Sequence, residues 1–322
     1  MVEEVLPGLY RIEIPLPRSP LKALNSYLIK DKSRCLIIDT GMNREECRRQ
    51  MFSALARLDV DLKRTDFFIT HLHVDHLGLV ATLATDMSRI YFNQLEADIV
   101  NSGWRWEAVS TLYRASGFPE EELKKSLAGH PGRRYGPGDQ VNFHILREGD
   151  KVEAGDYSFS CLDTPGHTPG HMCLYEANKK ILISGDHILF DITPNITVWP
   201  EMENPLKDYL VNLEKVYPLE VKLVLPGHRR IWNNHQGRIR ELQQHHQTRL
   251  SEIISALREE DKTAFQIAPY ITWDVDYPSW EKFPAPQKWF AVGETLAHLK
   301  YLEEDGRLQR KTKAGKIVFS LK

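Results

Sequence analysis

The chain has 322 residues, of which 42% are hydrophobic and 27% are charged, and 42 Lys and Arg residues nearly balance 44 Asp and Glu residues. This composition excludes collagen-like, mucin-like and largely disordered proteins. The net charge of −2 gives no overall attraction to nucleic acid or anionic lipid. At roughly 150 residues per domain, the length predicts two domains or one large domain with an appendage.

The N-terminal sequence MVEEVLPGLYRIEIPLP has no basic segment followed by an apolar run. No stretch reaches the roughly 18 apolar residues of a membrane span. We therefore expect a cytoplasmic protein with no membrane partner. The four cysteines have no C-x-x-C spacing, which favours reduced thiols over a disulfide scaffold; they are Cys35, Cys47, Cys161 and Cys173.

The first part of the chain alternates short β-rich runs with turns. Strands are expected at residues 10–14, 26–29, 35–38 and 66–70. The third of these ends in Asp39-Thr40-Gly41, where the chain must turn. A helix then runs to Asp59, and Asn43 is its expected N-cap. The fourth strand leads into His71-Leu-His-Val-Asp-His76, so a loop rich in metal-binding side chains is expected at its carboxyl end.

Residues 94–128 lack strand patterning and carry apolar and aromatic side chains at intervals, which predicts helices. They belong to a helical insertion at about 94–135. As a lid, this insertion would place Trp104, Trp106 and Tyr113 in contact with substrate. The alternative is that the helices pack at the edge of the scaffold without touching substrate.

Strand patterning returns after residue 141. Further strands are expected at residues 143–146, 157–162, 171–175, 181–183 and 221–225, and helices at residues 205–217 and 239–257. On the last helix, we expect His245 and His246 to lie on a solvated face; the alternative is that, with Arg249, they support the site from outside. A helix at 287–304, a C-cap at Gly306 and a hairpin turned at Ala314-Gly315 predict a small winged-helix-like module. We divide the chain into a catalytic domain, 1–235, and a long helix with this module, 236–322.

Four potential metal ligands lie within six residues of one loop: His71, His73, Asp75 and His76. Imidazole and carboxylate groups are donors that a borderline divalent ion such as Zn²⁺ accepts. Alone, this loop could also be a polar segment that is rich in histidine by chance. Three further donors, each directly after a strand-like run and beside a glycine, favour the metal site; they are His167, Asp186 and His228.

The motifs Thr70-His-Leu-His-Val-Asp-His76, Gly166-His-Thr, Ser184-Gly-Asp186 and Pro226-Gly-His228 follow Asp39-Thr-Gly in this order. Together they resemble the five motifs of the metallo-β-lactamase superfamily. The resemblance covers roughly residues 5 to 230. It implies an α+β fold, the four-layer αββα sandwich, with two metal ions at the sheet edges.

The resemblance also implies the ligand set. One metal ion is expected at His71, His73 and His167, the other at Asp75, His76 and His228, with Asp186 bridging both. Asp75 and Asp186 are the expected catalytic carboxylates. Asp39, Thr70 and His171 are expected to orient the ligands from outside, although Asp39 could equally cap the following turn. Zn²⁺ is the expected metal for imidazole and carboxylate donors, and because no thiolate among them demands zinc, Fe and Mn are alternatives.

Two such ions favour a bridging hydroxide as nucleophile, which predicts a hydrolase. The expected substrate is an ester, thioester or lactone of a small acid, with Arg229 and Arg230 contacting its anionic group. The alternative is a metal-dependent endoribonuclease or phosphodiesterase acting on single-stranded RNA. A non-hydrolytic di-iron redox protein is a third hypothesis, disfavoured because no flavin-binding βα repeat follows residue 230.

The C-terminal hairpin is locally basic. Its cations are Arg307, Arg310, Lys311, Lys313 and Lys316. Winged helices often bind nucleic acid, so RNA is a possible partner. We favour a small-molecule substrate and a module that serves packing or homodimer formation.

Overall fold

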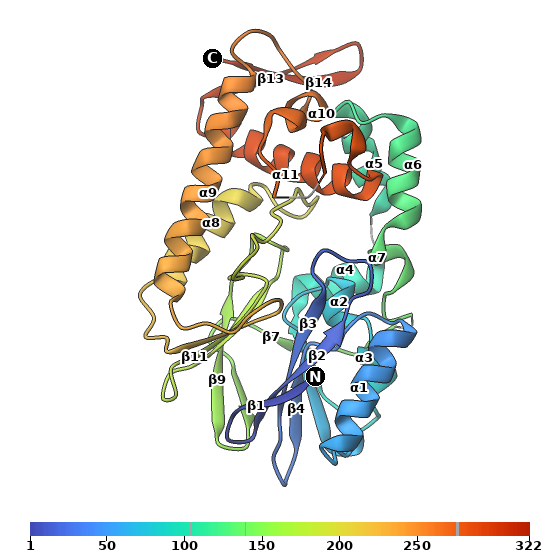
Figure 1. Ribbon diagram of the computed structural model, residues 1–322, viewed down its shortest axis with the longest axis vertical. Helices are drawn as coiled ribbons and strands as arrows, with labels where there is room; N and C mark the ends of the chain where they lie inside the picture. The colour runs from blue at the N-terminus through green and yellow to red at the C-terminus, as the bar shows by residue number, and fades with distance from the viewer. Residues whose placement is uncertain (104, 139, 275–276) are drawn as a thin grey trace.

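The protein is described by a computed structural model that covers residues 1–103, 105–138, 140–274 and 277–322. Two β-sheets face each other at the core (Figure 1). The first sheet has the order β1-β2-β3-β4-β5-β6-β7, in which neighbours from β1 to β4 are antiparallel and those from β4 to β7 are parallel. Its strands are β1 (Val2–Leu6), β2 (Leu9–Pro15), β3 (Ala23–Ile29), β4 (Cys35–Ile38), β5 (Thr65–Phe68), β6 (Ile90–Asn93) and β7 (His144–Leu146).

The second sheet has the order β12-β11-β10-β9-β8. The β11–β12 pair is parallel and the other pairs are antiparallel, so this sheet is mixed as well. Its strands are β8 (Lys151–Ala154), β9 (Tyr157–Asp163), β10 (Met172–Glu176), β11 (Ile181–Gly185) and β12 (Leu223–Pro226). A separate hairpin pairs β13 (Leu308–Lys313) with β14 (Lys316–Leu321).

Helices cover the sheets and form the C-terminal part of the chain. Those of the first half are α1 (Glu45–Arg57), α2 (Val74–Leu77), α3 (Val80–Leu83), α4 (Gln94–Ser102), α5 (Trp106–Ala115), α6 (Glu120–Gly129) and α7 (Pro131–Arg134). Those of the second half are α8 (Pro205–Val216), α9 (His235–Ala256), α10 (Ala264–Ile267) and α11 (Ala285–Glu304). None of these helices is long and apolar enough to cross a membrane.

Three hydrophobic cores hold the layers together. Phe68 and Ile38 of the first sheet meet Phe159 and Ile183 of the second in the core between the sheets. The other two cores join each sheet to helices, with α1 beside the first sheet and α8 and α9 beside the second. In β2, Tyr10, Ile12 and Ile14 face the core between the first sheet and its helices, while Leu9 faces the core between the sheets, because successive side chains of a strand point to opposite faces. The fold is therefore an α/β sandwich of two mixed sheets.

Most of the predicted elements are present. The strand expected at residues 35–38 is β4 itself, and the helices expected within 94–128 are α4, α5 and α6. The cap predicted at Asn43 is wrong. Arg44 occupies the N-cap position of α1 with no side-chain cap bond, while Asn43 turns toward the insertion and donates to the carbonyl of Gly136, 3.3 Å away.

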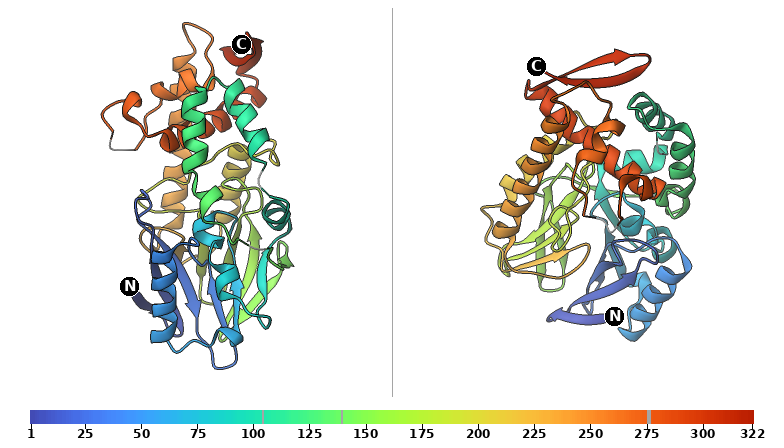
Figure 2. Two further views of the ribbon diagram at one scale, coloured as in Figure 1. Left: turned by 90° about the vertical axis from the view of Figure 1, so that its right-hand side faces the viewer. Right: turned by 45° about the horizontal axis from the view of Figure 1, so that its top comes forward.

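The insertion packs against the C-terminal module, as the green and red helices show in Figure 2. Tyr113 of α5 stacks on Trp289 of α11 with ring centroids 3.9 Å apart. Lys288 of α11 forms a 2.8 Å ion pair with Glu122 of α6. The winged-helix character of this module stays a prediction, although Gly306 and the turn between β13 and β14 do have the expected positive φ values.

Candidate metal centre

The predicted ligands meet at one end of the sandwich because each follows the carboxyl end of a strand. The loop after β5 carries His71 and His73, and the short helix α2 carries Asp75 and His76. The remaining predicted ligands lie after β9, β11 and β12, and they are His167, Asp186 and His228. The predicted ligands thus gather in three overlapping clusters of groups that could hold a metal ion.

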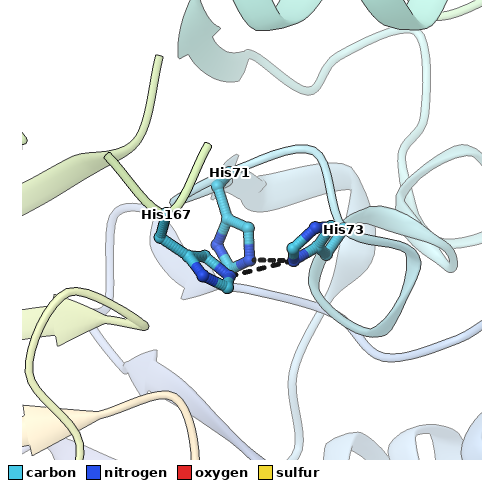
Figure 3. A group of neighbouring side chains, drawn as sticks. All are labelled: His71, His73 and His167. Carbon is cyan, nitrogen blue, oxygen red and sulfur yellow. Dashed lines mark hydrogen bonds between the residues drawn. The ribbon is translucent and has the colours of Figure 1, made fainter. Parts of the chain in front are cut away.

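Three imidazole rings converge in the first cluster. Nε2 of His71 and Nε2 of His167 each lie 3.0 Å from Nδ1 of His73 (Figure 3). Nδ1 of His73 offers either one proton or one lone pair, so it can form at most one full hydrogen bond with these two neighbours. Ligands of a tetrahedral Zn²⁺ at roughly 2.0–2.1 Å lie about 3.3 Å apart, close to the observed spacing.

Asp186 lies between the first cluster and a second one, which consists of Asp75, His76 and His228. Its Oδ2 atom is 3.6 Å from Nε2 of His167 and 3.5 Å from Nε2 of His228, while its Oδ1 atom is 3.5 Å from Nε2 of His76. Nε2 of His228 is also 3.4 Å from Oδ2 of Asp75. One carboxylate therefore faces imidazoles of both clusters, which is the position that a bridging ligand requires.

Two backbone carbonyls fix the outer nitrogens of the ligand rings. Nδ1 of His167 donates to the carbonyl of Asn195 at 2.8 Å, and Nδ1 of His228 donates to that of Ala23 at 2.7 Å. Because the proton of each neutral ring then lies on Nδ1, the lone pair on Nε2 faces the cluster.

The carboxylate of Asp39 fixes the outer ring nitrogen of His76. It accepts from Nδ1 of His76 at 2.7 Å and from the backbone N–H and hydroxyl of Thr70 at 2.8 and 2.9 Å. The Thr70 oxygen lies 3.0 Å from Nδ1 of His71 and can accept its proton. Asp39 has a positive φ of 58°, and these bonds hold it in that conformation. Asp39 and Thr70 therefore contact the outer nitrogens of the predicted ligands His76 and His71, and their orienting roles stay predictions.

His171 is in contact with the backbone of the predicted ligand Asp186. Its Nε2 accepts the backbone N–H of Asp186 at 3.1 Å, and its Nδ1 lies 2.8 Å from the hydroxyl of Thr164. Both ring nitrogens thus have partners in the protein. In this arrangement His171 holds the Asp186 backbone and offers no lone pair to a metal.

The centre contains buried polar atoms that no hydrogen bond satisfies within the described residues: Nε2 of His76, Nε2 of His228 and Oδ1 of Asp186. Such atoms are costly to bury without a partner. A side chain at Gly227 would fill this space, because a Cβ there would lie 2.6 Å from Oδ1 of Asp186. The donors, their unpaired state and the open space fit two divalent ions.

The electrostatics of the clusters support the same conclusion. Burial strongly lowers the pKa of His71, and the rings around it lower this pKa further, so His71 is neutral. Burial also acts to lower the pKa of His76, but Asp39 and Asp186 outweigh it and raise the pKa to about 10. The carboxylates thus attract positive charge to this point, and a metal ion that binds there displaces a proton.

Sequence reasoning missed Glu96, a fully buried carboxyl in the first turn of α4. It accepts the backbone N–H of Gly170 at 2.7 Å and that of Leu72 in a shorter bond. Glu96 therefore ties the loop after β5 to the loop after β9. Burial raises its pKa to about 7, and the backbone bonds oppose this rise.

Four of the five predicted substrate contacts lie within the described residues, where they have partners in the protein. Arg229 donates to the carbonyl of Pro20, and Arg230 pairs with Asp191 at 2.9 Å. Tyr113 is buried against α11, and its hydroxyl donates to the carbonyl of Trp289 at 3.1 Å. The remaining two are tryptophans: Trp106 contacts the ring of His130, and Trp104 lies outside the described residues. Their roles in substrate binding stay predictions.

Comparisons with known proteins agree with this geometry. The family described as "Metallo-beta-lactamase superfamily" matches residues 21–228, and the family described as "Metallo-beta-lactamase-like, C-terminal domain" matches residues 250–321. The chain is 26% identical over 295 residues to "Probable metallo-hydrolase YqjP" of Bacillus subtilis, covering 87% of each protein. It is 26% identical over 214 residues to human "Acyl-coenzyme A thioesterase MBLAC2", covering 63% of this chain and 72% of that protein.

A solved structure matches the whole chain. It is the crystal structure of metallo-beta-lactamase family protein TTHA1429 from Thermus thermophilus, which superposes with a TM-score of 0.84 at 29% sequence identity. The match covers 99% of this chain and 100% of that one. The sandwich and the C-terminal helices therefore occur together in another protein.

Proposed function

The chain belongs to the metallo-beta-lactamase superfamily and has the His/Asp metal-binding site of a hydrolase, and from this premise we propose that it hydrolyses an ester, thioester or lactone of a small acid. The observation that carries the proposal is the position of Asp186, whose carboxylate faces imidazoles of both ligand clusters. This arrangement supports a dinuclear centre. Zn²⁺ is the proposed metal because the donors combine imidazole and carboxylate, with Fe and Mn as alternatives.

The seven predicted ligands would hold two divalent ions, and such ions would supply an activated water at neutral pH and polarise the carbonyl oxygen of the substrate. The protein residues prepare this chemistry. Asp39 and the two backbone carbonyls keep the ligand rings in one tautomer, so that no lone pair has to reorient during the reaction. Asp75 and Asp186 are both buried, and their carboxylates would lie beside the cations held there.

A thioester is our first choice within the acyl class. The support comes from relatives, since the names of the human protein and of a fungal one, "Atrochrysone carboxyl ACP thioesterase" of Aspergillus fumigatus, both contain thioesterase. The fungal protein is 22% identical to this chain over 239 residues. These names suggest an acyl group on a carrier thiol as the substrate to test first.

The RNA alternative depends on the basic hairpin of the C-terminal module. Two of its cations are engaged by acidic neighbours: Arg310 lies 3.2 Å from Glu303, and Lys313 lies 2.6 Å from Asp261. Such pairs reduce the positive charge that the hairpin offers to phosphates. We therefore rank a small acyl substrate above RNA, and we interpret the winged-helix-like module as a packing element.

A parallel assay tests the proposal. Purified protein is incubated with a panel of acyl thioesters, esters and lactones, and separately with a labelled RNA oligonucleotide at two salt concentrations. The Asp75→Ala protein serves as the blank, because it lacks one predicted ligand. We expect hydrolysis of at least one acyl substrate that the blank loses. RNA cleavage that the blank loses and salt weakens, with every acyl substrate inert, would overturn the proposal.

A further inference from the structure

The segment between β11 and α8 connects the metal centre to the C-terminal module. Residues 187–204 form neither helix nor strand, so side-chain contacts fix their course. This segment binds the ligand His167 twice. The carbonyl of Asn195 accepts from its ring at 2.8 Å, and the indole of Trp199 donates to its backbone carbonyl at 3.1 Å.

Asn195 is in turn fixed from helix α11. Its side-chain amide donates to Oε2 of Glu294 at 2.7 Å. The segment also approaches α11 closely at the preceding helix position, because a Cβ at Gly293 would lie only 2.3 Å from the hydroxyl of Thr197. In Figure 1 this yellow segment lies directly beneath α11. Helix α11 therefore sets the position of the carbonyl that orients His167.

Glu294 is itself held by a third element. Its Oε1 forms an ion pair with Arg249 of α9, and both side chains are buried. The Arg249 guanidinium also lies over the ring of Trp273 at 4.5 Å. The buried guanidinium on one oxygen therefore limits where the other oxygen of Glu294 can meet Asn195.

We propose that Glu294 is a positioning residue for the metal centre, acting through Asn195 on His167. The C-terminal module then completes the catalytic site instead of only covering it. This inference rests on the proposed function in one respect, namely that His167 binds a metal ion. It does not depend on which substrate is hydrolysed.

Zn²⁺ binding to the whole chain tests the inference. Metal-free protein is titrated with Zn²⁺ against a chromophoric chelator, and the variants are Asn195→Ala and Glu294→Gln. Both variants keep the backbone carbonyl of Asn195 that accepts from His167 and remove only the bond that fixes it to α11, so the loss of affinity should be smaller than the roughly 10-fold or more that follows removal of an outer contact. We expect this loss of affinity in one of the two Zn²⁺ dissociation constants, namely the constant of the cluster that contains His167. Asn195→Ala keeps the Arg249–Glu294 pair intact, so the module should remain folded.

The double variant separates positioning from general damage. If Glu294 acts only through Asn195, the double variant should bind Zn²⁺ as Asn195→Ala does, with no further loss. Glu304→Gln is the matched control, because Glu304 on the same helix accepts from Asn204, whose bonds do not reach a predicted ligand. We expect unchanged Zn²⁺ binding in this control.

Three results would overturn the inference: unchanged Zn²⁺ constants in both single variants, losses that multiply in the double variant, or an equal loss in the control. A failure of the proposed function would give different experimental results. A wild-type protein that binds two Zn²⁺ ions but cleaves only RNA contradicts the acyl substrate and leaves the inference standing. A wild-type protein that binds no Zn²⁺ contradicts both.

Discussion

Replacing Asp39 by Asn tests how the ligands are oriented, because the change keeps the size of the side chain and removes one acceptor. The carboxylate now accepts from His76 and from the N–H and hydroxyl of Thr70. If the side-chain oxygen in the Asp39→Asn variant faces Thr70, the side-chain NH₂ group faces Nδ1 of His76. The ring would then accept at Nδ1 and carry its proton on Nε2, where the metal lone pair is needed.

We expect Zn²⁺ affinity to fall by roughly 10- to 100-fold, the usual effect of losing such a contact. This corresponds to about 1.4–2.7 kcal/mol. In the metal-free protein, one of the three buried donors that Asp39 now satisfies would lose its partner, which should also lower the free energy of unfolding by roughly 1–3 kcal/mol. Chelator competition measures the affinity, and urea unfolding of metal-free protein measures the stability.

Asp66→Asn is the matched control. Asp66 is also buried, and its carboxylate accepts from the side chain of Arg34 and from the backbone N–H of Arg89, away from the predicted ligands. We expect it to lose stability but to bind Zn²⁺ as the wild type does. Unchanged Zn²⁺ affinity in Asp39→Asn, or the same loss of affinity in Asp66→Asn, would refute this account of the tautomer.

Three further predictions follow from the contacts described above. Glu96→Gln should lower the free energy of unfolding by roughly 1–3 kcal/mol in urea, because one of two backbone donors loses its acceptor; an unchanged midpoint would mean that Glu96 does not tie the two loops. Trp289→Ala should cost roughly 3–5 kcal/mol in the same assay, because it empties the stack against Tyr113; a cost below about 1 kcal/mol would show that the insertion and module are not coupled there. Removal of metal by a chelator should lower Tm, and Zn²⁺ at roughly 100 times Kd should restore about 2.7 kcal/mol per site; a Tm independent of Zn²⁺ would contradict metal binding to the folded state.

The ligand loop could be predicted from the sequence because its donors are close neighbours along the chain. His71, His73 and His76 lie within six residues, directly after a run of apolar strand residues. The glycines beside His167, Asp186 and His228 added an independent signal. Most strands were predictable for the same reason, since a short apolar run between turns is a local signal; β1, β6 and β8 were not predicted.

The supporting contacts could not be predicted, because they join residues that are far apart in the sequence. Glu96 lies 74 residues from Gly170, and Asn195 lies 99 residues from Glu294. A single Glu or Asn in a polar stretch has no local pattern that reveals such a partner. Only the packing of α4 and α11 against the loops brings these groups together.

The expectation for α9 failed for a related reason. His245 and His246 were predicted on a solvated face, but His246 is fully buried and its Nδ1 lies 3.0 Å from Nε2 of His298 on α11. The face is polar because it meets the C-terminal module through hydrogen bonds and ion pairs. Polar composition alone does not distinguish such an interface from a face in water.

The metal content of the protein purified without chelator tests the central claim most directly. Elemental analysis on a known amount of chain gives the number of ions bound, whatever the substrate proves to be. The account predicts two divalent ions per chain in the wild type, held on either side of Asp186. One fully occupied site, or no bound transition metal, would contradict the dinuclear centre.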